Sequence, residues 1–189
     1  MMLLPGYDVS KAAQVIAFFA MKEGRPINIL KVTKLAYLAE RESMARFDEP
    51  MCYDKFASLP EGPVPSITLN LMNGSFFDAR WRRFVGARKG YNIPLARADL
   101  TISDFDHISE ADLDILEHLW KRFGHMDGYA LRDWTHVASN VPEWVDPEGS
   151  SNPIEHKTVY EKLGKRDPVA LVESIEEFRA LNRMLDEVC

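Results

Sequence analysis

The stretch LPEGPVPSITLNLMNG, residues 59–74, carries three prolines and a glycine within its first seven residues. Gly62 and Val64 each precede a proline, whose ring pushes the preceding residue out of the helical region of backbone space. The chain must therefore stay extended at both positions. Pro65 has the fixed φ that suits the first turn of a helix, where its missing N–H is not needed. The stretch predicts a rigid corner that leads straight into a short helix.

The helix after this corner is expected to bury one of its sides. Three apolar residues share a face at helical spacing: Val64, Ile67 and Leu71. Asn73 and Gly74 then supply a left-handed exit from the helix. Before the corner, residues 51–59 form a short and mixed segment, and we expect a strand or an extended arm there.

Helical signals dominate the remainder of the chain. Ser109 gives the clearest start, because a serine N-cap is followed there by acidic residues in the first helical turn. Apolar periodicity, capping residues and terminal glycines predict helices over about 9–22, 28–45, 109–123, 128–137, 152–163 and 168–188. The last helix has an apolar stripe formed by Leu171, Ile175, Phe178, Leu185 and Val188.

The strongest β signal lies at residues 81–97. Trp81–Val85 and Tyr91–Arg97 are aromatic and β-branched runs, and the turn between them, Gly86–Gly90, is bounded by glycines. This pattern is typical of a β-hairpin. The chain is therefore predicted to be mainly α, a single compact helical domain over residues 1–189 with a small β-hairpin or short sheet and a C-terminal helix.

Composition places the chain among ordinary globular proteins. It has 189 residues, of which 46% are hydrophobic and 28% charged, and its formal net charge is −6. A chain of this length buries roughly 70% of its unfolded surface and needs neither a metal nor disulfides to fold. The acidic balance argues against a general nucleic-acid binder, since phosphate contacts require a basic face.

The expected location is the cytoplasm. Cys52 and Cys189 form neither a disulfide framework nor a zinc motif, and two isolated thiols fit a reducing compartment. The N-terminal residues lack the basic and apolar regions of a signal peptide. No segment of the sequence reaches the length needed to span a bilayer. We expect a cytoplasmic protein without a membrane partner, a cofactor or a metal.

The sequence contains no complete catalytic motif. The five histidines lack metal-binding spacing, and neither a phosphate-binding glycine loop nor a Gly-x-Ser-x-Gly nucleophile motif occurs. The best enzyme alternative is Asp133 with His136, because a carboxylate that orients a histidine is a known catalytic arrangement. The same pair is also an ordinary i, i+3 neighbour on a helix, and we favour helix-end capping. No catalytic residue is therefore assigned.

A basic and aromatic segment at residues 79–91 is the strongest candidate for a binding surface. Its cations and aromatics are Arg80, Trp81, Arg82, Arg83, Phe84, Arg88, Lys89 and Tyr91. Such residues supply most hot spots of protein interfaces, and they also bind single-stranded nucleic acid by stacking and charge. A third interpretation is a hairpin whose aromatics pack inward while its arginines are solvated. All three stay open, and the segment is the predicted partner-binding surface.

Four landmarks follow one another along the chain in a characteristic order. They are KVTKLAYLAE at 31–40, FASLPEGPVPSITLNLMNG at 56–74, ISEADLDILEHLWKRFGHMDGYALRDWTHV at 108–137 and NVPEW at 140–144. In this order they resemble the Panacea domain, the SocA-like antitoxin family, over about residues 10–163. The residues that match the motifs of the family are Lys34, Leu35, Tyr37, Gly62, Pro63, Val64, Thr135, His136 and Trp144.

The resemblance implies an antitoxin that binds and neutralises a cognate toxin protein. Members of the family pair with unrelated toxins, some resemble adaptors that deliver the toxin to a cytoplasmic protease, and others occur in phages and prophages. Nucleic acid is not an expected partner. Two places depart from the family pattern. Glu61 stands where an aromatic or basic residue usually precedes Gly-Pro, and Val141 and Glu143 crowd the Pro-Trp motif.

The resemblance also suggests where a partner binds. The corner at residues 62–65 is expected to hold one side of a binding surface rigid, which lowers the entropy lost on binding. A family that meets unrelated toxins should vary its contact surface while keeping its core. The segment at 79–91 lies outside the landmarks, so we expect it to contribute to partner specificity. The alternatives are the last helix and the loop at 142–153.

Overall fold

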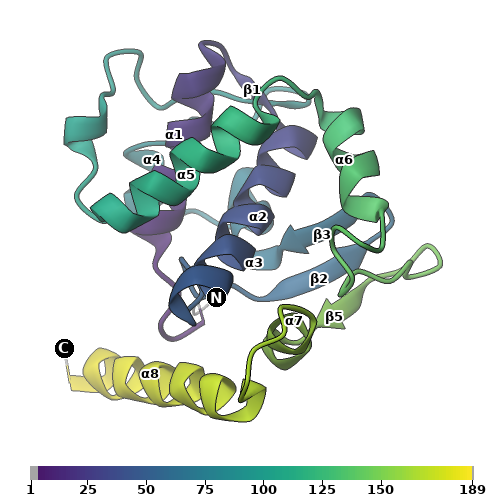
Figure 1. Ribbon diagram of the computed structural model, residues 1–189. Helices are drawn as coiled ribbons and strands as arrows, with labels where there is room; N and C mark the ends of the chain where they lie inside the picture. Colours follow the sequence, from purple (N-terminus) through teal and green to yellow (C-terminus); the bar gives the residue numbers. More distant parts are fainter. Residues whose placement is uncertain (1–3, 189) are drawn as a thin grey trace.

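The computed structural model describes residues 4–188. Within them the chain forms eight α-helices, one short 3-10 helix and two small sheets, so the predicted mainly α fold is confirmed. Figure 1 shows α5 crossing α1 and α2, the larger sheet beside α2, and α8 at the end of the molecule away from α5. Across the described residues, no helix combines the length and the apolar character that crossing a membrane requires.

Two long helices form the centre of the core. α1 spans Val9–Glu23 and α2 spans Ile29–Phe47. Asp8 caps α1 by accepting a hydrogen bond from the Lys11 N–H at 2.8 Å, and Asn28 caps α2 by accepting from two backbone N–H groups. Both helices are buried on almost every side along their middle turns, which is the pattern of central core helices.

The proline-rich corner forms a β-hairpin. β2 (Phe56–Leu59) pairs antiparallel with β3 (Gly62–Pro65), and β5 (Asn152–Ile154) pairs with the other edge of β2. The strand order is therefore β3-β2-β5. Both outer strands contain proline, which has no N–H to donate to a further strand. The prolines thus help to close the sheet at both edges.

The short helix after the corner is α3 (Ser66–Met72). Pro65 does not enter its first turn as predicted, because it remains paired in β3 and serves as the residue before the helix. The cap comes from Asp54 instead. Its carboxylate accepts hydrogen bonds from the Ile67 and Thr68 N–H groups at 2.8 and 2.9 Å.

The hairpin predicted at residues 81–97 forms only in part. Asp78 caps α4 (Ala79–Arg82) with its side chain, so the first predicted arm begins as a helix. Backbone hydrogen bonds beyond α4 still bring the chain back on itself. However, β4 (Asn92–Ile93) pairs with β1 (Ile27–Asn28) rather than with the first arm. A capped helical turn satisfies its N–H groups locally, and this outweighs the β propensity of the segment.

The second half of the chain follows the predictions with one exception. α5 (Glu110–Phe123) begins at a capping box formed by Ser109 and Asp112, and α6 (Gly128–His136) follows it. α7 (His156–Lys162) begins later than expected. The predicted helix start at Asn152 belongs to β5, because pairing with β2 holds that segment extended.

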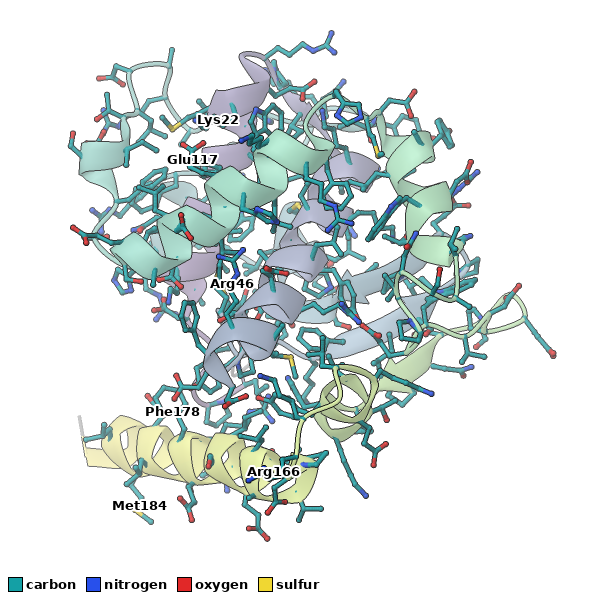
Figure 2. All side chains as sticks on the ribbon, in the orientation of Figure 1. Lys22, Arg46, Glu117, Arg166, Phe178 and Met184 are labelled. Carbon is teal, nitrogen blue, oxygen red and sulfur yellow. The ribbon has the colours of Figure 1, made fainter. Side chains whose placement is uncertain are left out.

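The last helix, α8 (Pro168–Val188), packs on the body along only part of its predicted stripe. Ile175 is buried, and the ring of Phe178 stacks on Tyr53 with centroids 4.3 Å apart. Three apolar residues further along are exposed: Leu181, Met184 and Leu185. Figure 2 shows Phe178 turned toward the body and Met184 turned away from it. The side chain of Val188 and the residue Cys189 lie outside the described part of the chain.

Candidate functional site

Residues from three of the landmarks meet around Gly62, and Trp144 of the fourth landmark stacks on one of them. A β-carbon at this position would lie 2.9 Å from Lys34 Nζ, 3.0 Å from Thr135 Oγ1 and 3.1 Å from His136 Nε2. The backbone of Gly62 also has a φ of +101°, which side-chain-bearing residues rarely adopt. Only glycine therefore lets the β2–β3 turn approach α2 and α6 this closely.

Lys34 joins the hairpin to α2. Its side chain is fully buried, and Nζ donates a hydrogen bond to the Pro63 carbonyl oxygen at 2.9 Å. Burial lowers the pKa of Lys34 to about 7, an effect that the nearby charge of Arg132 adds to and that of Glu61 opposes. The neighbouring motif residue, Leu35, is buried in the hydrophobic core.

His136 and Trp144 hold the loop after α6 against the hairpin. Their rings stack with centroids 4.1 Å apart, and Trp144 Nε1 donates to the Leu59 carbonyl oxygen at 3.1 Å. His136 Nε2 is buried without a hydrogen-bond partner among the described residues. Burial first, and then the positive charges of Lys34 and Arg132, lower the pKa of His136.

Glu143 anchors the same loop to α2. Its carboxylate is buried and accepts hydrogen bonds from Tyr37 Oη at 2.7 Å and from Arg41 Nε at 2.6 Å. The glutamate that departs from the family pattern thus has a structural partner in Tyr37, a residue of the pattern itself. Buried charges are stable when they are paired and hydrogen-bonded in this way.

The acid–base pair of the enzyme alternative is not assembled. Asp133 Oδ1 accepts hydrogen bonds from Arg132 and is largely exposed, whereas His136 stacks on Trp144. The two side chains thus engage different partners. Among the described residues there is also no group of three or more His, Cys, Asp or Glu side chains that could hold a metal ion.

A groove of about 420 Å³ lies on the outer side of this cluster. It is bounded by the start of α2, the β2–β3 hairpin, α3, α6 and the loop before β4. Figure 1 shows α6, α2 and the hairpin side by side. The residues that line it are Asn28, Ile29, Leu30, Thr33, Lys34, Leu59, Glu61, Val64, Leu69, Asn73, Arg88, Tyr91 and Tyr129. Family-motif residues and residues of the basic segment therefore share one surface.

Two exposed tyrosines form the rim of the groove. Tyr91 is 72% exposed and Tyr129 is 66% exposed. Each ring lies near an arginine: the Arg88 guanidinium is 5.8 Å from the Tyr91 centroid, and that of Arg132 is 5.1 Å from the Tyr129 centroid. Tyr129 and Arg132 are not among the binding residues predicted from the sequence. The sequence signal that could have identified them as a pair is their i, i+3 spacing on a predicted helix.

The basic segment divides between buried and exposed residues. Trp81 and Phe84 are 1% and 2% exposed, so for these two the inward-packing alternative holds. Both side chains pack in the hydrophobic core, so they are not part of the partner-binding surface that was predicted for this segment. Tyr91 stays outside, and Arg82 is half-buried. Trp81 is buried because α4 packs against α1, and this contact removes the apolar surface of the indole from water.

The cations of the segment face two different sides. Arg88 and the exposed Lys89 lie in the loop beside the groove. Arg80 pairs with Asp78, and Arg83 pairs with Asp106; both arginines line a second hollow beside the N-terminal segment and α8. The continuous basic strip that a single-stranded nucleic acid would follow is therefore interrupted.

Comparison with known proteins adds one match. The family model described as antitoxin SocA-like, Panacea domain matches residues 32–144. This range runs from α2 to Trp144 and contains all the motif residues described above. No curated protein and no solved structure matches the chain significantly.

Proposed function

The chain belongs to the SocA-like antitoxin family with the Panacea domain, and from this premise we propose that it neutralises a cognate toxin protein by binding it directly. The proposed setting is the cytoplasm. The motif residues support a structural interpretation, since Lys34, Gly62 and His136 fasten the hairpin to the helices. That framework leaves the surface above it for recognition.

The observation that carries the proposal is the position of the groove. Its floor is built on the hairpin and α2, which contain motif residues, whereas Arg88 and Tyr91 on its rim come from a segment outside the motifs. Tyrosine and arginine supply most hot spots of protein interfaces. The rigid turn at Gly62 keeps one wall in place before binding, which reduces the ordering cost of association.

We favour neutralisation by masking the toxin, with delivery to a cytoplasmic protease as the alternative route. The two routes differ in the lifetime of the toxin. Masking leaves the toxin as stable in cells with the antitoxin as without it, whereas delivery shortens its lifetime and requires the protease.

The test uses the protein encoded by the neighbouring gene. That protein is expressed from an inducible promoter, alone and together with the full chain, and growth is followed after induction. We expect arrest with the neighbour alone and rescue on coexpression, and a stable complex of the two purified proteins by size-exclusion chromatography. A neighbour that does not arrest growth, or arrest that persists despite soluble antitoxin, would contradict the proposal.

A matched pair of variants links rescue to the groove. Replacing both rim tyrosines, as Tyr91→Ala with Tyr129→Ala, should abolish rescue. Phe77→Ala is the control, because Phe77 is an aromatic residue 77% exposed and does not line the groove. Rescue that persists in the double tyrosine variant would place the interface elsewhere, and equal loss in Phe77→Ala would show that the effect is not specific to the groove. Pulse-chase labelling of the toxin in the same cells distinguishes masking from delivery to a protease.

A further inference from the structure

The groove combines apolar walls with one cation, Arg88, that has no carboxylate partner in the part of the chain that the structure describes. Arg88 Nε donates to the Gly90 carbonyl oxygen at 2.6 Å, and its Nη1 donates to Asn73 Oδ1. Both acceptors are neutral. Among the described residues, no carboxylate lies within ion-pair distance of Arg88. The guanidinium is thus held in a fixed position with its charge uncompensated.

In this respect Arg88 differs from three arginines of the basic segment and α6. Arg80, Arg83 and Arg132 each have an aspartate or glutamate within 4 Å. The one acidic residue that lines the groove, Glu61, already pairs with Arg132. On a chain with a net charge of −6, this groove is a local site that favours a negatively charged group.

The walls of the groove determine which kind of side chain can enter it. Leu30, Leu59, Val64 and Leu69 give the groove an apolar lining. Its volume of about 420 Å³ is at the lower end of the roughly 300–1,000 Å³ typical of ligand pockets. It therefore suits a short segment with an apolar side chain rather than the flat face of a domain.

An added β-strand is not the expected occupant. An extended peptide that joins a sheet is held by main-chain hydrogen bonds to an exposed edge. The edge strand beside the groove is β3, in which Pro63 and Pro65 have no N–H to donate. The occupant must therefore be held by its side chains.

We propose that the groove binds a short segment of a protein partner in which an apolar side chain enters between Leu30, Val64 and Leu69 and a neighbouring aspartate or glutamate pairs with Arg88. The identification of that partner as the toxin rests on the function proposed above. A carboxylate meets a preformed, oriented guanidinium here, so one charge-assisted contact adds orientation to the apolar contact.

The test selects peptides directly on the purified full chain. A phage-displayed random peptide library is selected in parallel on the wild type, on Arg88→Glu and on Arg166→Glu. Arg166 is an exposed arginine that Figure 2 places at the turn before α8, away from α6. Thermal melting of all three proteins is the control for folding, and only folded variants enter the selection.

The wild type and the Arg166→Glu control should enrich one consensus, an apolar residue beside an aspartate or glutamate. Arg88→Glu should keep the apolar residue and replace the acidic one by lysine or arginine. The wild-type consensus peptide should bind Arg88→Glu at least about thirtyfold more weakly, as expected for loss of a hot spot. No enrichment, a consensus without an acidic residue, or an acidic consensus that survives in Arg88→Glu would each overturn the proposal.

The outcome is separable from that of the growth assay. Growth rescue together with a failed selection would remove the groove assignment and leave the antitoxin function. The expected consensus together with a harmless neighbouring protein would remove the toxin as the partner and leave the groove as a binding site for acidic, apolar segments.

Discussion

The imidazole of His136 lies flat on the indole of Trp144, with ring centroids 4.1 Å apart and planes 6° from parallel. The two residues come from the end of α6 and from the loop that follows it. Because Trp144 also donates to the Leu59 carbonyl oxygen, the stack fastens that loop to β2. A histidine of the family motif is thereby engaged in packing.

Trp144→Phe should keep the aromatic stack and lose the indole hydrogen bond. We expect a decrease of about 1 kcal/mol in the free energy of unfolding, the usual net value of one hydrogen bond. Trp144→Leu also removes the stack and should cost roughly 0.5–1.5 kcal/mol more. Urea denaturation followed by circular dichroism measures both. Equal losses in the two variants would mean that the stack adds no stability.

Gly62→Ala should destabilise the protein by two effects. The backbone at φ +101° disfavours a side chain, and the new β-carbon would lie 2.9 Å from Lys34 Nζ. A left-handed backbone alone costs a non-glycine residue roughly 1–2 kcal/mol. Gly74→Ala is the control, since Gly74 has a φ of +73° and nothing within 4 Å of the added carbon. Gly62→Ala should therefore lose clearly more stability than Gly74→Ala in urea titrations, and equal losses would contradict the close packing at Gly62.

Lys34→Met should remove a specific pH dependence of stability. The pKa of Lys34 is lowered from 10.5 to about 7 in the folded chain, so between these values the unfolded chain holds the proton that the folded chain lacks. The contribution of Lys34 to stability is therefore present above pH 10.5 and is lost as pH falls toward 7. The difference in unfolding free energy between wild type and variant should rise with pH by up to about 1.4 kcal/mol per unit. Urea titrations at several pH values in this window measure the slope, and a flat difference would show that Lys34 stays charged.

Glu40→Gln should have the opposite pH signature. Burial, and then the charge of Asp54, raise the pKa of Glu40 from 4.5 to about 8. Its contribution is thus complete below pH 4.5 and is lost as pH rises through about 8. Relative to the glutamine variant, the wild type should lose stability across that range. Glu42→Gln is the control, because Glu42 on the same helix is partly exposed and pairs with Arg46. A difference that does not vary with pH would mean that Glu40 is ionised in the fold.

Arg88→Ala with Tyr91→Ala should weaken toxin binding at least about thirtyfold, because a hot spot contributes at least roughly 2 kcal/mol. Thermal stability should stay nearly unchanged, since exposed side chains contribute little to it. Arg83→Ala is the control from the same segment, and it lies beside the second hollow rather than the groove. Isothermal titration calorimetry with the purified toxin gives the affinities. A larger loss in Arg83→Ala would move the interface to the α8 side.

Several elements of the fold follow from local signals that the sequence displays. The caps at Asp8, Asn28 and Ser109 fixed the starts of three helices. Apolar periodicity then gave their extents, because helix hydrogen bonds and side-chain faces depend on residues only three or four positions apart. The prolines at 63 and 65 required an extended chain, which is what β3 provides.

The partner of each strand could not be predicted from local sequence signals. β2 pairs with β5, a segment about a hundred residues later whose sequence resembled a helix start. The segment at 81–97 looked like a hairpin, yet Asp78 capped a helical turn and β4 paired with β1. Pairing between distant segments depends on which surfaces the assembled helices leave open, and local propensity does not contain that information.

The candidate site also combines features that the sequence predicts with features that only the tertiary structure decides. The sequence by itself determined which residues carry the family pattern and that a cluster of arginines and aromatics interrupts it. Only the tertiary structure decided that Trp81 and Phe84 are core residues, that Lys34 is buried beneath Gly62, and that Arg88 lies with Tyr129 around one groove. The physical reason is that burial and proximity are properties of packed surfaces, which exist only once α2, α6 and the hairpin have been brought together.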